Sequence, residues 1–151
     1  MPQSISRDVP LNEITLRRYE KPYDMPKREL IRKLCLSLGV LQPGDSRDII
    51  VDILHALINA REHKTLLNAE TIQEHVILLR TNANLPKKGI ALSNIRRQLK
   101  RLRDISLAEK IKSDYRITEF HDLATIFDTH LTKYYLDTIL TRVREYCTAL
   151  K

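Results

Sequence analysis

Apolar residues repeat at helical spacing through much of the chain. They recur three and four positions apart over 25–38, 47–62 and 68–80. This spacing gathers the apolar side chains on one face of a helix. Turn-forming residues at 42–46 and 81–89 separate the three stretches. The pattern therefore predicts three amphipathic helices in succession.

The segment from Ser93 to Arg103 predicts a fourth helix of a different character. Ser93 is a residue type that caps helix N-termini. Ile95, Leu99 and Leu102 fall within about 60° of one another around a helix axis. Burying this apolar stripe turns the remaining arc towards solvent. That arc is mostly basic and contains Arg96, Arg97, Lys100, Arg101 and Arg103.

Beyond the basic helix the pattern changes from helical spacing to alternation. Residues 107–112 alternate apolar and polar side chains, 113–114 suit a tight turn, and 115–117 favour a strand. We expect a two-stranded β-hairpin over 107–117. A short amphipathic helix over 120–127, beginning with a cap at Thr118, then follows.

The last predicted helix runs from about 131 to 150 and carries a heptad-like apolar seam. The seam residues are spaced four and three apart and are Leu136, Leu140, Val143, Cys147 and Leu150. Because the seam spans only about two heptads, packing on its own domain and pairing with a second chain both explain it. We favour a homodimer that forms through this C-terminal helix.

Length and composition fit one mainly α domain with extensions. The chain has 151 residues, 42% of them hydrophobic, with 3 Gly and no Trp. We divide it into an arm (1–24), a helix and loop (25–45), a central domain (46–128) and the C-terminal helix (129–151). No apolar run approaches the about 18–20 residues that span a bilayer, so we expect a cytoplasmic protein that does not enter membranes.

The net charge of +7 lies in one segment. Between 86 and 112, nine basic residues face two acids, whereas seventeen bases and seventeen acids balance in the rest of the chain. A concentrated excess on one element is the electrostatic footprint expected for a polyanion partner. A solvated face on an ordinary helical domain is the alternative explanation.

Other candidate chemistry is sparse. Cys35 and Cys147 lack metal-site spacing, and we interpret both as packing residues, with a disulfide across a dimer as the alternative. The five His form no ligand motif, and no phosphate-binding loop or nucleophile elbow is present. Asp48 and Asp52, one helical turn apart, are interpreted as exposed surface carboxylates. We expect no enzyme, no metal and no cofactor.

In chain order, helix, helix, loop, basic helix, hairpin and helix is the layout of a winged helix-turn-helix domain. The residues SNIRRQLKRL at 93–102, LAEKI at 107–111 and YRIT at 115–118 resemble the recognition helix and wing of archaeal and bacterial winged-helix transcriptional regulators. The likeness covers about half of the chain, 48–127. It implies a sequence-specific regulator that binds double-stranded DNA.

The resemblance implies that helix 93–103 enters the major groove and that the wing, 107–117, lies on phosphates. Arg bonds to guanine edges, Asn to adenine edges, and Lys neutralises phosphates. Because the N-terminal part of a recognition helix reads bases, we assign base readout to Ser93, Asn94, Arg96 and Arg97. The expected backbone contacts are Lys100, Arg101 and Arg103 of the helix and Lys110, Lys112 and Arg116 of the wing.

One departure from the family pattern is the connection from Arg80 to Ser93, which is longer than the tight turn of a helix-turn-helix. Lys87 and Lys88 then belong to an inserted loop that adds phosphate contacts. Two other functions stay open. A winged-helix module of a protein assembly would use the basic helix on an acidic protein surface. An RNA-binding protein is the other, although few aromatic residues lie beside the basic helix as stacking platforms.

Overall fold

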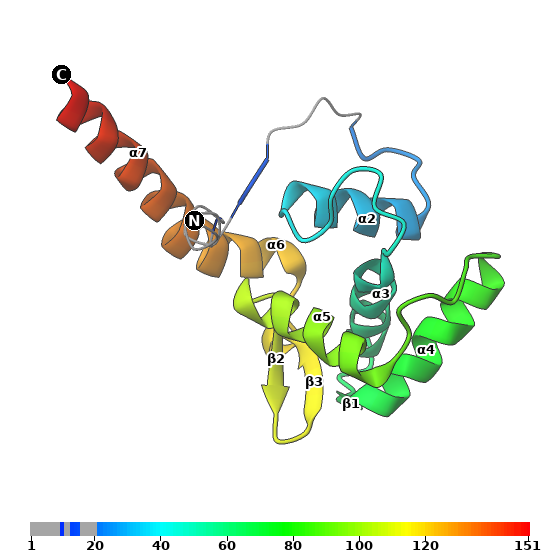
Figure 1. Ribbon diagram of the computed structural model, residues 1–151. Helices are drawn as coiled ribbons and strands as arrows, with labels where there is room; N and C mark the ends of the chain where they lie inside the picture. The colour runs from blue at the N-terminus through cyan, green and yellow to red at the C-terminus, as the bar shows by residue number, and fades with distance from the viewer. Residues whose placement is uncertain (1–9, 11–12, 16–20) are drawn as a thin grey trace.

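The computed structural model describes residues 10, 13–15 and 21–151, so most of the predicted arm lies outside the described residues. The described chain is mainly helical and has one small sheet (Figure 1). No helix in this part is long and apolar enough to cross a membrane. The elements are α2 (Lys27–Ser37), α3 (Ile49–Arg61), β1 (Leu67–Asn68), α4 (Ala69–Asn82), α5 (Leu92–Asp104), β2 (Ala108–Ile111), β3 (Asp114–Ile117), η1 (Thr118–Phe120), α6 (Leu123–Ile126), η2 (Phe127–Leu136) and α7 (Asp137–Leu150).

The sheet has three antiparallel strands in the order β1-β3-β2. β2 and β3 form the predicted hairpin, with Ala108 opposite Ile117 and Ile111 opposite Asp114. The short strand β1 pairs with the other edge of β3, where Leu67 lies opposite Tyr115. β1 could not be predicted, because two residues are too few to show an alternating pattern.

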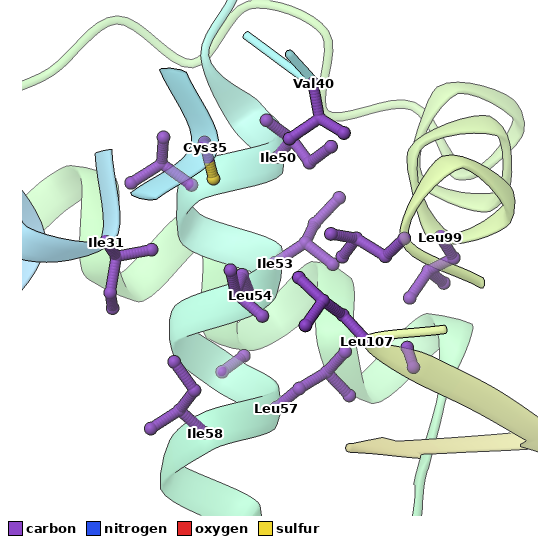
Figure 2. Close-up of a cluster of buried hydrophobic side chains, with 14 of the residues drawn as sticks. Ile31, Cys35, Val40, Ile50, Ile53, Leu54, Leu57, Ile58, Leu99 and Leu107 are labelled. Carbon is purple, nitrogen blue, oxygen red and sulfur yellow. The ribbon is translucent and has the colours of Figure 1, made fainter. Parts of the chain in front are cut away.

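α3 forms the centre of the hydrophobic core. Its sequence is apolar almost all round, and a helix of that kind is buried on all sides. Accordingly, nine of its 13 residues are buried. In Figure 2 the side chains of α3 lie between Cys35 of α2 on one side and Leu99 of α5 and Leu107 on the other. α3 therefore packs between α2 and the basic helix α5.

A cluster of four charges, two of them buried, links α2, α4 and the start of α3. Arg80 and Asp52 are only 2% and 1% exposed, and their Nη1 and Oδ2 atoms are 2.8 Å apart. Arg80 also pairs with Asp48 at 2.9 Å, and Arg28 bridges both carboxylates at 3.0 Å. Burial raises the pKa of Asp52, and the hydrogen bond from Arg80 opposes that rise. The prediction that both carboxylates are exposed was therefore wrong, because Arg28 and Arg80 bring the opposite charge to them.

The C-terminal part is one uninterrupted helical segment from Leu123 to Leu150, rather than the two separate helices predicted. It begins with Asp122, whose carboxylate accepts hydrogen bonds from Thr125, so the cap expected at Thr118 is wrong. The hydroxyl of Thr118 instead donates to the carbonyl of Ser106.

The middle of this segment, η2, is a π-helix attached to the domain. Leu131 is 2% exposed, and the Tyr135 hydroxyl donates to the carbonyl oxygen of Asp104 at 2.6 Å. Beyond this anchor α7 has no buried residue and extends away from the other helices (Figure 1). Cys35 is buried, as expected of a packing residue, whereas Cys147 is exposed in α7 and does not pack on the described part of the domain.

We expect His55 to make the stability of the protein fall on acidification. Its Nδ1 is buried without a hydrogen-bond partner among the described residues. Burial, followed by the charges of Lys27 and Arg28, lowers the pKa of His55 from 6.5. The unfolded chain therefore binds this proton more readily than the folded protein, and stability is lost as the pH falls below 6.5.

This prediction is checked by thermal unfolding at about pH 7 and about pH 5. The Tm of the wild type should fall further between the two pH values than that of a His55→Gln variant, which has no titrating ring. Equal falls in the two proteins would show that His55 contributes nothing to the pH dependence.

Candidate nucleic-acid interface

α5 turns its apolar stripe inwards and its basic residues outwards. Ile95, Leu99 and Leu102 are fully buried. The exposed residues of the helix include all the basic ones, as the spacing predicted: Arg96, Arg97, Lys100, Arg101 and Arg103. Because one helix face is held by the core, the orientation of the basic face is fixed.

The start of α5 differs from the prediction. The helix begins at Leu92, and the residue before it, Ala91, makes no side-chain capping hydrogen bond. Leu92 packs against the core, which explains why the helix starts one residue before the expected cap. The expectation that Ser93 caps the helix was therefore wrong. Ser93 lies in the first turn, where its side chain is exposed.

Arg97 is the most outward-pointing cation of α5. At about 100° per residue it lies opposite the buried stripe, with Ser93 one turn before it and Arg101 one turn after it. Arg97 forms no hydrogen bond or ion pair with any residue in the described part of the chain. Two neighbouring cations have partners within α5. Lys100 forms an ion pair with Asp104 at 3.1 Å, and Arg101 donates a hydrogen bond to Gln98 at 2.9 Å.

Two of the four predicted base-reading residues already have partners within the protein. The half-buried Asn94 donates through Nδ2 to the carbonyl oxygen of Gly89 at 2.6 Å and accepts from Gln98 through Oδ1. Arg96 pairs with Glu70 of α4 at 3.2 Å, and both side chains are about half exposed. Exposed pairs of this kind contribute only about 0–1 kcal/mol. Arg96 can therefore exchange its partner more readily than Asn94 can.

Three side-chain hydrogen bonds hold the long loop between α4 and α5, residues 83–91. Asn94 holds Gly89, the Nε of Arg80 donates to the carbonyl of Pro86 at 2.5 Å, and Gln73 donates to the carbonyl of Ile90 at 2.8 Å.

Gly89 suits its place in this loop for two reasons. It has a φ of +77°, and a Cβ there would lie 3.0 Å from Nδ2 of Asn94. The fastened loop carries the exposed Lys87 and Lys88 directly before α5. The predicted long connection is thus confirmed.

The hairpin that follows α5 carries two kinds of basic residue. Lys110 and Lys112 are exposed, and Lys112 lies at the turn with a φ of +59°. Arg116 is less accessible, because Glu109 pairs with it at 2.6 Å and the Phe120 ring lies 4.8 Å from its guanidinium carbon. Glu109 and Arg116 are direct partners in the strand register, so the predicted hairpin already contained the signal for this pair.

The loop, α5 and the hairpin follow one another along the chain and together carry all the predicted basic residues. In Figure 1 the hairpin projects from the body beside α5. The exposed cations of this region without an ion pair to a described residue are Lys87, Lys88, Arg97, Arg101, Arg103, Lys110 and Lys112. Such a cluster attracts a polyanion, while Glu70, Asp104 and Glu109 neutralise some of the remaining charges.

Comparison with family models, with curated proteins and with solved structures finds no match to this chain.

Proposed function

We propose that the chain is a winged-helix protein that binds double-stranded DNA as a sequence-specific transcriptional regulator. The order of its elements supports this assignment, since three helices, α3, α4 and α5, are followed at once by the β2–β3 hairpin. β1 adds a third strand beside the hairpin. In this arrangement α5 is the recognition helix and the hairpin is the wing.

The observation that carries the proposal is the exposed basic face of α5. The helix is held by a fully buried stripe, so its guanidinium groups are presented on a rigid support. Arg97 has no partner among the described residues and points away from the core. Guanidinium groups bond bidentately to O6 and N7 of guanine in the major groove, which is wide enough to admit a helix.

The contact roles follow from the exposure of each residue. Ser93 and Arg97 read bases, because they point outwards from the first turns of α5. Arg96 also reads bases once its ion pair with Glu70 is broken. Asn94 does not read bases, because its hydrogen bond to Gly89 holds the loop 83–91. The remaining exposed cations contact phosphates, and these are Lys87, Lys88, Lys100, Arg101, Arg103, Lys110 and Lys112. We further propose that the protein acts as a homodimer through its C-terminal helix, so that two copies read two half-sites.

The proposal is tested by selecting bound fragments from a mixed pool of genomic DNA. We expect the wild type to enrich fragments that share a sequence. An Arg96→Ala/Arg97→Ala double variant, which keeps the buried stripe, should lose this enrichment. The control is Lys33→Ala in α2, outside the proposed interface, which should select the same fragments as the wild type.

Two results would contradict the proposal. Weak binding by the wild type without enrichment would favour a module of a protein assembly, in which α5 meets an acidic protein. Displacement of bound DNA by single-stranded RNA at lower concentration than by duplex DNA would favour an RNA-binding protein.

A further inference from the structure

α7 is an amphipathic helix, and most of its large apolar side chains are exposed. Leu140 is 52% exposed, Val143 56%, Tyr146 65% and Leu150 84%. α7 continues the anchored helical segment that begins at Leu123, but none of its 14 residues is buried, so it gains little of the stability that helices in proteins draw from packing an apolar face. A partner that covers the seam would therefore stabilise α7.

The heptad positions identify the residues that flank the seam. Spacings of four and three place Leu140 and Cys147 at a, and Leu136, Val143 and Leu150 at d. Asp137 and Arg144 each follow a d residue and occupy e. Ile139 and Tyr146 each precede an a residue and occupy g. One flank of the seam is therefore charged and the other is apolar.

The direction of pairing decides which flanks meet. In a parallel pair e faces g, so Arg144 of one copy would lie against Ile139 of the other and no opposite charges would meet. In an antiparallel pair e faces e and g faces g. Asp137 then meets Arg144 of the second copy at both ends of the two-fold pair, and Ile139 meets Tyr146. The charges and the apolar flank are both matched only in the antiparallel direction.

The surface beside Ile139 provides room for an incoming aromatic ring. A hollow of about 500 Å³ lies at the base of α7, lined by Pro10 and by residues of the C-terminal segment that include Tyr135, Ile139 and Val143. Tyr146 of an antiparallel second copy would reach this hollow, because Ile139 and Tyr146 face each other across the pair. The same register places Leu136 opposite Cys147 and Leu140 opposite Val143.

We propose that two copies of the chain associate through α7 in the antiparallel direction, with Asp137 paired to Arg144 and Tyr146 seated beside Ile139. This inference rests on the homodimer in the proposed function and specifies its interface. The paired part, residues 136–147, is about 18 Å long, so the two domains lie at opposite ends of the pair. The basic helices α5 are then related by a two-fold axis, which suits an operator with two-fold symmetry.

Disulfide trapping distinguishes the two directions. A disulfide needs Cα atoms within about 7 Å, so it forms only between positions that face each other. Cys147 is exposed, whereas Cys35 is fully buried and burial raises the pKa of its thiol to about 12, which makes it unreactive. Cys147 is therefore the only native thiol that a mild oxidant, oxidised glutathione, will reach.

In the antiparallel dimer, Leu136→Cys should form a covalent dimer with Cys147 on a non-reducing gel. The wild type and Leu136→Cys/Cys147→Ser should stay unlinked, because identical positions lie far apart. A covalent dimer of the wild type through Cys147 would overturn the antiparallel direction and establish a parallel pair.

Light scattering of the same proteins separates this inference from the existence of the dimer and from DNA binding. The wild type should be a dimer whose dissociation constant rises roughly tenfold in Asp137→Arg and recovers in Asp137→Arg/Arg144→Asp. Val143→Asp should give a monomer whose helical circular dichroism signal falls by no more than the share that the 14 residues of α7 contribute. A monomeric wild type would overturn the homodimer altogether, whereas fragment selection tests DNA binding independently.

Discussion

Replacing Arg80 with Met is expected to lower the free energy of unfolding by about 3 kcal/mol. Removing one partner of a buried ion pair costs about 3–5 kcal/mol, because the other charge stays buried without compensation. Asp52, 1% exposed, would lose its bond to Arg80 and keep only Arg28, at 3.0 Å. We expect the lower end of the range because Arg28 still pairs with both carboxylates.

Urea unfolding followed by circular dichroism measures this loss. The matched control is Arg47→Met, at an exposed arginine whose side chain has no ion pair within the described residues, and it should change stability by less than about 0.5 kcal/mol. A double variant, Arg80→Met/Asp52→Leu, should recover part of the loss, because no carboxylate is then buried at position 52. A loss below about 1 kcal/mol in Arg80→Met would show that Arg28 alone neutralises the cluster.

The helices of the domain could be predicted because the side chains that pack in the core recur at helical spacing along each of them. The stripe Ile95, Leu99 and Leu102 predicted both α5 and the exposure of its basic residues, and both are confirmed. The hairpin was predictable from its alternation and its turn. These features depend on residues close together in the sequence, and local spacing carries that information.

The charged cluster could not be predicted in the same way. Asp52 and Arg80 are 28 residues apart, and their pairing depends on how α3 packs on α4. With Asp48 one turn away, Asp52 has the spacing of an ordinary surface pair. Only the apolar character of the rest of α3 hinted that one of these carboxylates would be buried.

Two contacts within the candidate interface between residues on different elements could not be predicted from the sequence either. Asn94 reaches back to Gly89, and Arg96 reaches across to Glu70 of α4. Both contacts depend on where the loop 83–91 and α4 come to lie. The sequence therefore predicted the exposed basic face of α5 but not that Asn94 and Arg96 already have partners within the protein.

Arg97 and Lys112 are expected to affect DNA binding in different ways, although each contributes one exposed charge. Arg97→Ala should lower the affinity for the selected sequence by about 5- to 150-fold, which corresponds to the about 1–3 kcal/mol of one bidentate base contact. Lys112→Ala should weaken binding to every duplex by a similar factor. It should also reduce the slope of log K against log salt by about 0.9, because one phosphate contact is lost.

Arg97→Lys separates charge from geometry at the same position. Lysine keeps the positive charge but cannot form the planar, bidentate contact of a guanidinium group. We therefore expect the variant to keep the wild-type salt slope while it loses preference at one base pair, as measured by titrating the selected duplex and its single-base variants at several salt concentrations. If Arg97→Lys kept the full sequence preference, or if Lys112→Ala changed it, the division of α5 and the hairpin into base-reading and phosphate-binding parts would be wrong. The proposal would then have to reassign which residues contact bases and which contact phosphates, while the number of exposed charges would stay the same.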